Sequence, residues 1–571
     1  MTTRSTPIRT FLPANLEISS WEILETWLID LQDRELNNLE SLEKWLLDLS
    51  EMEAFIEEDA AWRYIRMTIN TKDEKLTESY QWFVSEIQPK ISPFSNAFNL
   101  KLAESPFAES LTGRAYQIYL RQIQKEIELF REENIVLQSE IAQFSQEYGA
   151  RIGAMEVEMD GETMTMPKAA SELQKTDRSR RQLVWEAIQS VRNEAIEELD
   201  ELFTKLRDKR HQVATNSAFT NFRDYKFEEM GRFDYSKEDC FDFHDSIARQ
   251  IKPIVTEFLN ARCTDLGLDK LRPWDLAVDP KQNSPLKPFG TANELLEKSV
   301  AVFSKVDPYF GECLSTMNEM GYLDLASKEG KAPGGYNYPL YESGVPFIFM
   351  NAVGTQRDMV TMMHEGGHAV HSFLTKNLPI TAFKSCPSEV AELASMTMEL
   401  LSMDHWDVFY PNVKDLNRAK KDHLEDILSV LPWIAIVDKF QHWIYANPSH
   451  SITERKNEWV RIYEEFTTGL IDYDGLEEAK AYMWQKQLHI FEVPFYYIEY
   501  GMAQLGAIAI WRNFKSDPNK AIADYKKALT LGYTASIPEI YEAAGISFDF
   551  SSNNVGELAN FVKDQLEQLK D

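Results

Sequence analysis

The run His364-Glu365-Gly366-Gly367-His368 constrains this chain more than any other stretch, because it places two imidazoles four residues apart. Residues i and i+4 lie on one face of a helix, so both imidazoles can bind one tetrahedral zinc ion. Glu365 lies about 100° round the helix from His364, near enough to a bound water to act as a general base. The run matches the H-E-x-x-H pattern of zinc hydrolases, and a chance match on a solvated helix is the alternative.

The residues around this motif predict a helix. Thr355 is the expected N-cap, and helix-compatible residues continue from Gln356 to Leu374. Gly366 and Gly367 each lower helix propensity by roughly 1 kcal/mol relative to alanine. A helix that tolerates this cost is expected to need the close approach of another backbone or of substrate.

A catalytic zinc ion with two histidine ligands needs a third protein ligand and an open position. The metzincin pattern would put a histidine at position 374, but that residue is leucine. The next carboxylates, on a predicted second helix, are those of Glu389, Glu392 and Glu399. Glu392 could bind the metal and Glu399 could orient a ligand histidine, while Glu389, one turn earlier, is the rival ligand. His371 is expected to hydrogen-bond near the site and not to bind zinc.

These residues resemble the thimet oligopeptidase and neurolysin family, and more closely its oligoendopeptidase F branch. In that family the third zinc ligand is a glutamate followed three residues later by a serine, which implies Glu392, with Ser395 after it. The resemblance is strong over roughly the C-terminal half and only general before it. The matching stretches are Gly334-Gly335-Tyr336, 347–351, 364–371, 392–395 and 494–501.

The segment from His489 to Tyr500 is the cluster richest in both histidine and tyrosine. A metallopeptidase needs a donor for the oxyanion opposite the metal, and an imidazole or phenol supplies one without a competing negative charge. The resemblance implies this role for His489, Tyr496 and Tyr500, and it leaves Tyr497 possible. Without the resemblance, an aromatic helix of the core would be the better interpretation.

Two short β-strands are predicted at 322–325 and 345–350, on either side of the glycine-containing loop 330–336. An exposed strand edge beside a zinc helix can pair with an extended peptide, and glycines allow its backbone to approach closely. A purely structural sheet is the alternative; the resemblance favours substrate binding. The residues expected to contact substrate are Gly334, Gly335, Tyr336, Phe347, Phe349 and Tyr497.

Composition narrows the function classes. The 571 residues include 60 basic and 91 acidic ones, and the resulting net charge of −31 is the opposite of a nucleic-acid-binding footprint. The four cysteines have no CxxC spacing, so neither a disulfide framework nor a thiolate zinc site is indicated. No uncharged stretch approaches about 18 residues. We expect a cytoplasmic protein with no nucleic-acid or membrane partner; an oligomeric state cannot be derived from the sequence.

The rest of the chain predicts a mainly α-helical fold. Residues 1–18 are expected to be extended and poorly anchored. Apolar residues from Tyr116 to Phe144 alternate in steps of four and three, a coiled-coil pattern with Asn134 at a seam position. Asp160-Gly161 predicts a β-hairpin, and a second helix at about 177–212 would pack back on the first.

We therefore expect an N-terminal helical lobe, 1–215, which includes this hairpin arm at about 114–212, and a zinc-peptidase catalytic region, 216–571. The resemblance implies a small β-sheet beside the zinc site and two lobes that enclose a deep substrate channel.

Together these observations predict a zinc-dependent oligoendopeptidase that cuts internal bonds of short peptides. One zinc ion per chain would be held by His364, His368 and Glu392, and would activate water. Glu365 would take the proton of this water and deliver it to the leaving amine. A zinc exopeptidase with the same metal site is the main alternative. A non-catalytic helical interaction protein, whose partner docks on the arm, is the other.

Overall fold

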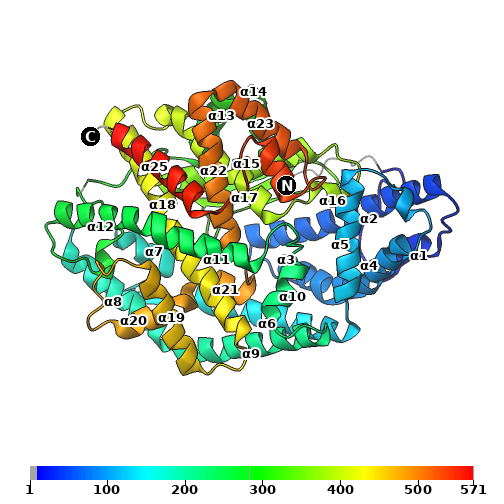
Figure 1. Ribbon diagram of the computed structural model, residues 1–571, viewed down its shortest axis with the longest axis horizontal. Coiled ribbons are helices and arrows are strands. Elements are labelled where there is room, and N and C mark those ends of the chain that lie inside the picture. The colour runs from blue at the N-terminus through cyan, green and yellow to red at the C-terminus, as the bar shows by residue number, and fades with distance from the viewer. Residues whose placement is uncertain (1–8, 282, 570–571) are drawn as a thin grey trace.

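The computed structural model describes residues 9–281 and 283–569 (Figure 1). The fold is mainly α-helical, with two small sheets, which confirms the predicted fold class. None of the described helices combines the length and the apolar composition that crossing a bilayer requires.

The N-terminal helices α1, α2, α4 and α5 lie together at the right of Figure 1. They form because apolar residues recur at helical spacing: Leu24, Leu28 and Leu31, for example, are the buried residues of the first helix. The elements of this region are α1 (Trp21–Asp33), α2 (Leu39–Ile69), α3 (Glu74–Trp82), the π-helix η1 (Phe83–Ile87), α4 (Gln88–Ala103), the 3-10 helix η2 (Ala108–Ser110) and α5 (Arg114–Leu129).

The prediction of a poorly anchored N-terminus is wrong from residue 9 onward, and residues 1–8 lie outside the described residues. Arg9 Nε donates to Glu342 Oε1 at 2.6 Å. The backbone N–H groups of Phe11 and Leu12 donate to Glu51 Oε1, and the Leu12 side chain is buried. Tertiary contacts thus fix a segment that has no regular secondary structure of its own.

The predicted coiled-coil helix is interrupted at Phe130, whose backbone is extended (φ −60°, ψ 128°). Arg131 stabilises the break, because its guanidinium donates to the carbonyl oxygens of Glu128, Phe130 and Asn216. The second half of the pattern, α6 (Glu132–Gly153), packs on α9 (Ile196–Asn216), as expected for a helical hairpin. The predicted second helix at about 177–212 is, however, divided at Ala195 into α8 (Arg178–Glu194) and α9. Asn134 fixes the register of α6 against α9, because its Nδ2 donates to Val213 O and Ser217 Oγ at the end of α9.

The tip of the hairpin is the predicted antiparallel pair, with Glu156 opposite Thr165 and positive φ at Asp160 and Gly161 in the turn. The elements from here to the central sheet are α6 (Glu132–Gly153), β1 (Glu156–Met159), β2 (Glu162–Thr165), α7 (Met166–Glu172), α8 (Arg178–Glu194), α9 (Ile196–Asn216), α10 (Phe222–Glu229), α11 (Lys237–Ser246), the π-helix η3 (Ile247–Ile251), α12 (Lys252–Leu266), the 3-10 helix η4 (Pro273–Asp275), α13 (Ala292–Val306) and α14 (Pro308–Met320).

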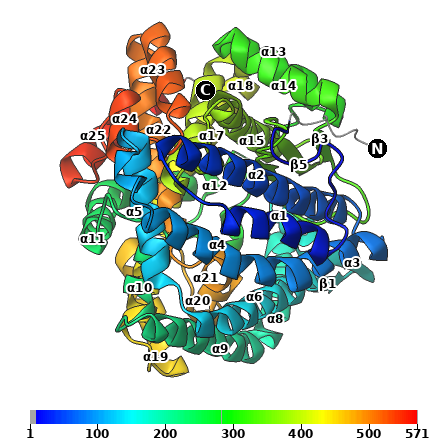
Figure 2. The ribbon, with the colours of Figure 1, turned by 90° about the vertical axis from the view of Figure 1, so that its right-hand side faces the viewer.

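The second sheet has three strands, β3 (Leu323–Ala326), β4 (Tyr336–Tyr338) and β5 (Phe347–Ala352). β5 lies in the centre, parallel to β3 and antiparallel to β4. Two of these strands were predicted, whereas Tyr336, which was assigned to a loop, begins β4. Figure 2 shows α2 beside β3 and β5, and Trp62 of α2 packs edge-on against Phe347.

The C-terminal half is helical and contains the elements that carry the site. They are α15 (Gln356–Thr375), α16 (Thr381–Lys384), α17 (Ser388–Ser402), the 3-10 helix η5 (Met403–Val408), α18 (Val413–Ala446), α19 (Ile452–Phe466), α20 (Glu477–Ala481), the 3-10 helix η6 (Met483–Lys486), α21 (Leu488–Glu492), α22 (Tyr497–Ser516), α23 (Pro518–Thr530), α24 (Ile537–Ala543) and α25 (Ser552–Gln568).

Helices α15 and α17 pack unusually closely at the glycine pair of α15. A Cβ atom added to Gly367 would lie 2.6 Å from Ser395 Cα and 2.8 Å from Ala394 O of α17. A Cβ atom on Gly366 would lie 2.5 Å from the Phe303 ring. The expected approach of another backbone is confirmed at Gly367, whereas Gly366 makes room for the Phe303 side chain. Thr355 caps α15 as predicted, since its Oγ1 accepts from Asp358 N.

We predict that Gly367→Ala lowers the free energy of unfolding by about 1–3 kcal/mol, the usual cost of overpacking a filled core. The added methyl group would meet backbone atoms of α17, which can move only with the helix. Thermal unfolding monitored by circular dichroism measures the change. The matched control is Gly153→Ala at the end of α6, where a Cβ atom meets nothing within 4 Å. Equal stability of the two variants would show that α15 and α17 do not need this contact.

Candidate metal centre

Three metal-type donors come together from two helices. His364 and His368 lie on α15 and Glu392 lies on α17, and one ligand atom of each lies within 4.8 Å of the others. Glu392 Oε2 is 3.3 Å from His364 Nε2 and 3.8 Å from His368 Nε2. Two imidazoles and one carboxylate are the donor set of open zinc sites, in which a fourth position is left for water or substrate. The residues predicted to bind zinc therefore form a group that could hold one cation.

The charge states of the three donors suit a cation. Burial alone would raise the pKa of Glu392, but its hydrogen bond and charge interactions with the two histidines outweigh burial and hold the pKa at about 2. Burial lowers the pKa of His368 to about 4, so this imidazole is neutral and has a free lone pair. For His364, burial alone would lower the pKa, but hydrogen bonds that the imidazole donates to the Glu392 and Glu399 carboxylates outweigh burial and raise it. A cation bound at this imidazole would displace its proton.

Neighbouring side chains fix the orientation of two donors. Glu399 Oε1, which was predicted to orient a ligand histidine, lies 2.7 Å from His364 Nδ1. Ser395 Oγ donates to Glu392 Oε2 at 3.2 Å, and Tyr496 Oη donates to Glu392 Oε1 at 2.9 Å. Contacts of this kind fix the tautomer of a ligand imidazole and the rotamer of a ligand carboxylate.

Two other candidates lie apart from the three donors. Glu389, the rival ligand, accepts a hydrogen bond from the Tyr235 hydroxyl at 2.5 Å and is not in the donor group. The Nδ1 atom of His371 lies 3.8 Å from Cys386 Sγ, and no described hydrogen bond joins His371 to any of the three residues of the metal-type group. His371 does line the cavity beside the group.

A cavity of about 390 Å³ opens beside the three donors. Glu365 lines it and is almost fully buried, and burial raises the pKa of this carboxyl to about 7. The side chain of Asn337 on β4 donates to the backbone oxygen of Glu365 and so joins the edge strand to α15. The lining from the predicted site is Gly335, Tyr336, His364, Glu365, His368, His371, Glu392, Tyr496 and Tyr500.

The predicted substrate contacts divide into two groups. Gly335 and Tyr336 line the cavity, and Gly334 precedes them with a φ of +96°. Contrary to expectation, Phe347 and Phe349 do not line it, because β5 is covered on both faces and both rings are buried in the core. Phe349 instead stacks on Tyr336 with ring centroids 4.8 Å apart, and so supports a side chain of the cavity wall.

The histidine and tyrosines of 489–500 cluster at the cavity. Tyr496 and Tyr500 line the cavity, and the rings of His489 and Tyr497 pack against these two tyrosines. The His489 ring centroid is 6.1 Å from that of Tyr496, 4.7 Å from Tyr497 and 5.7 Å from Tyr500. Burial raises the pKa of all three phenols, so each stays a hydrogen-bond donor at neutral pH.

An unusual turn aims Tyr496 at Glu392. Phe495 has a φ of +70°, a left-handed conformation that costs a non-glycine residue about 1–3 kcal/mol. Its N–H donates to Gln441 Oε1 at 2.8 Å, and its carbonyl accepts from the buried guanidinium of Arg232. Sequence reasoning missed both partners, which are 54 and 263 residues away along the chain and carry no local signal.

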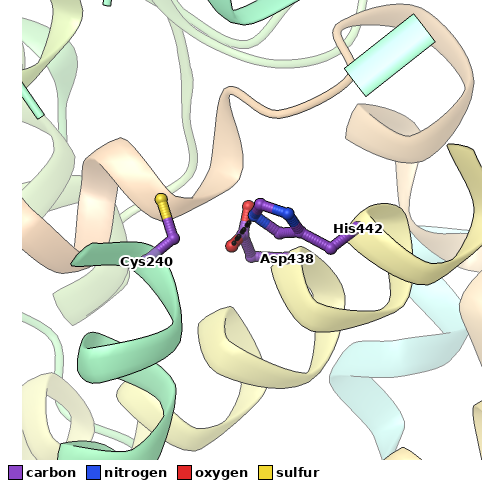
Figure 3. Close-up of side chains that lie close together, drawn as sticks. All are labelled: Cys240, Asp438 and His442. Atoms are coloured by element: carbon purple, nitrogen blue, oxygen red, sulfur yellow. Dashed lines mark ion pairs between the residues drawn. The ribbon is translucent and has the colours of Figure 1, made fainter. Parts of the chain in front are cut away.

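Another group of metal-type donors occurs among the described residues, Cys240, Asp438 and His442 (Figure 3). Asp438 and His442 lie on α18 and Cys240 lies on α11. Asp438 Oδ2 is 2.8 Å from His244 Nε2 and 3.2 Å from His442 Nε2. None of these residues lines the cavity, and the His442 ring packs against Phe495 at 5.3 Å. The group thus lies in the core behind the turn.

Sequence comparisons find two family patterns in this chain. The pattern of Peptidase family M3 matches residues 172–557, and that of the Peptidase M3 N-terminal domain matches residues 14–130. An oligoendopeptidase F homolog of Borreliella burgdorferi is 23% identical over 328 residues, which cover 56% of this chain and 54% of that protein. An oligoendopeptidase F homolog of Lactococcus lactis is 22% identical over 351 residues, which cover 57% of this chain and 55% of that protein. The chain thus spans about half the length of the curated relatives it matches.

Solved structures align over more of the chain. A structure described as a putative oligoendopeptidase F is 26% identical, covers 97% of this chain and 98% of its own, and has a TM-score of 0.90. A structure of PZ peptidase A with an inhibitor is 27% identical, covers 96% of each chain, and has a TM-score of 0.89. The helical architecture described above is therefore shared along nearly the whole chain.

Proposed function

The chain belongs to peptidase family M3, and on this basis we propose that it is a zinc-dependent oligoendopeptidase that hydrolyses internal bonds of short peptides. The observation that carries the proposal is the convergence of His364, His368 and Glu392 at a cavity that Glu365 also lines. Base, ligands and hydrogen-bond donors at one cavity are what hydrolysis of an amide requires.

His364, His368 and Glu392 would hold the zinc ion, one per chain. Zinc bound there would supply a Lewis acid that polarises the scissile carbonyl and makes water more acidic. Glu365 accepts a proton from the attacking water and delivers it to the leaving amine. A pKa of about 7 suits both transfers, because the group can then gain and lose the proton near neutral pH.

Tyr496 and Tyr500 face the same cavity and remain protonated, so they donate to the oxygen on which negative charge develops. In the structure Tyr496 donates to Glu392, which keeps its hydroxyl oriented before substrate arrives. His489 stacks against Tyr496, and in this proposal it contributes a further donor to the same oxygen.

The substrate backbone would pair with β4. This strand pairs with β5 along one edge, and no described strand pairs with the other. Its residues Tyr336 and Asn337 line the cavity next to Glu365. An extended peptide added to this edge would lie across the three donors, which favours cleavage within a chain over removal of a terminal residue.

The proposed function predicts cleavage of an internally quenched peptide of about ten residues, roughly 33 Å when extended, that is blocked at both ends. Bound metal is quantified in the same preparation, and mass spectrometry identifies the products. One zinc ion per chain and internal cuts are expected. Removal of single terminal residues from unblocked peptides only would assign an exopeptidase. Absence of both metal and cleavage would contradict the proposal.

Glu365→Gln is expected to retain the metal and to lose about 10²–10⁴-fold in kcat, the range for loss of a general base. The amide keeps the shape of the carboxylate but cannot accept the proton. Metal content and the circular dichroism spectrum serve as controls for binding and folding. Turnover within a few-fold of the wild type would exclude Glu365 as the base.

The two glutamates of α17 form a matched pair for assigning the third ligand. Glu392→Ala should abolish stoichiometric zinc binding, because it removes the carboxylate 3.3 Å from His364 Nε2. Glu389→Ala should keep the zinc and lower the melting temperature, because it leaves the buried Tyr235 hydroxyl without its acceptor. Metal analysis after dialysis distinguishes them, and the reverse pattern would reassign the ligand to Glu389.

A further inference from the structure

A chain of hydrogen bonds runs from α18 to His489. Trp433 Nε1 donates to Gln487 Oε1 at 2.9 Å, and Gln487 Nε2 lies 2.7 Å from His489 Nδ1. Gln487 lies between η6 and α21, two residues before the histidine. Neither Trp433 nor Gln487 takes part in the reaction proposed above.

The direction of these bonds follows from the chemistry of the three groups. An indole N–H can only donate, and it donates to the side-chain oxygen of Gln487, beside the Tyr497 hydroxyl, which also hydrogen-bonds to both groups. The amide nitrogen of Gln487, which can also only donate, is then turned to His489. Nδ1 of the imidazole must accept, and a neutral ring with an accepting Nδ1 carries its proton on Nε2.

Trp433 is itself held in place, which gives its N–H a fixed direction. Its ring lies edge-on to the fully buried Trp459, with centroids 5.6 Å apart. Trp433 and Lys486 also line a second cavity, of about 980 Å³. That cavity shares no lining residue with the cavity at the metal donors.

The charge state of His489 makes its tautomer matter. Burial lowers the pKa of this imidazole to about 4, although the negative charge of Glu392 opposes the shift. Near neutral pH the ring therefore has a single N–H, and only one of its two nitrogens can donate. With Nδ1 committed to Gln487, that donor is on the edge of the ring directed away from Gln487.

We propose that Gln487, oriented by Trp433, is a positioning residue that holds His489 as the Nε2–H tautomer and so presents a hydrogen-bond donor to the oxyanion. The inference rests on the proposed peptidase function, because it assigns a purpose to the donor. Its structural part, the position of the proton on His489, is independent of activity.

Apart from Lys486, the titratable groups around His489 keep one charge state between about pH 6 and 9. They are Glu392 of α17, whose pKa is about 2, and the phenols of Tyr496, just before α22, and of Tyr497 and Tyr500 in α22, whose pKa values are all raised. Lys486, whose pKa burial lowers to about 8, lies over the Trp433 ring, 5.0 Å from its centroid. Lys486 is unchanged in every variant compared below, so its titration cannot cause a difference between their pH profiles.

The first test locates the proton directly. ¹⁵N NMR of the full-length, metal-loaded protein with labelled histidine distinguishes a protonated from an unprotonated ring nitrogen, and His489→Asn identifies the signals of His489. We expect an unprotonated Nδ1 and a protonated Nε2 from about pH 6 to 9, well above the pKa of the ring. A proton on Nδ1 in the wild type would overturn the inference, whether or not the protein cleaves peptides.

The second test reverses the bond to His489. In Gln487→Glu the introduced carboxylate can only accept, so it raises the pKa of His489 and attracts the proton to Nδ1. Below the raised pKa the imidazolium still donates from Nε2. Above it the only proton is on Nδ1 and the donor is lost. We expect kcat to fall by about 10²-fold or more as pH rises through the new pKa, the usual cost of removing one oxyanion donor.

Gln487→Met is the matched control, because it keeps the length of the side chain without the charge or the hydrogen bond. It should lose about 10–100-fold in kcat at all pH values, as expected for loss of an orienting contact, and should show no new alkaline decline. The kcat of Trp433→Phe should lie between that of Gln487→Met and that of the wild type. Identical pH profiles of Gln487→Glu and Gln487→Met would overturn the inference, whereas absence of wild-type cleavage would instead contradict the proposed function.

Discussion

The candidate site depends on the close contact between α15 and α17. Two imidazoles spaced one turn apart are a property of any helix, but the carboxylate comes from a second helix whose backbone lies against Gly367. A side chain at this point would separate the helices and withdraw Glu392 from the histidines. The glycine pair lowers the helix propensity of α15 by about 2 kcal/mol in total, and packing against α17 and Phe303 offsets this cost.

Electrostatics then determines what the site can do. Glu392 and Glu365 are both buried, yet the first is held ionised by two histidines while burial brings the second to a pKa of about 7. Two carboxyl groups with such different acidities can take different roles, one as a ligand and the other as an acid and base. The difference arises from their partners, since His364 and Tyr496 contact Glu392, whereas the Asn337 backbone and the His364 charge do not outweigh burial at Glu365.

Features of the chain that have a local signal were accessible from sequence: the helix around His364, the turn at Asp160-Gly161, the mainly helical fold, and Glu399 as the neighbour of a histidine. Those that depend on tertiary contacts were not. The break at Phe130 is stabilised by carbonyls on two helices, and Phe349 is buried because β5 is covered on both faces. Trp433 and Gln487 lie 54 residues apart, so their bond to each other could not be predicted from spacing.

The turn at Phe495 restricts how this protein can change in evolution. Glycine would relieve the left-handed backbone, but it would remove a ring that packs on Phe227, His442 and Tyr445. Any larger replacement keeps the strain and must also fit that buried space. A single substitution therefore loses either the packing or the relaxed backbone. A substitution at this position therefore requires a compensating change nearby. Without one, it would also displace the neighbouring Tyr496 from its position in the site.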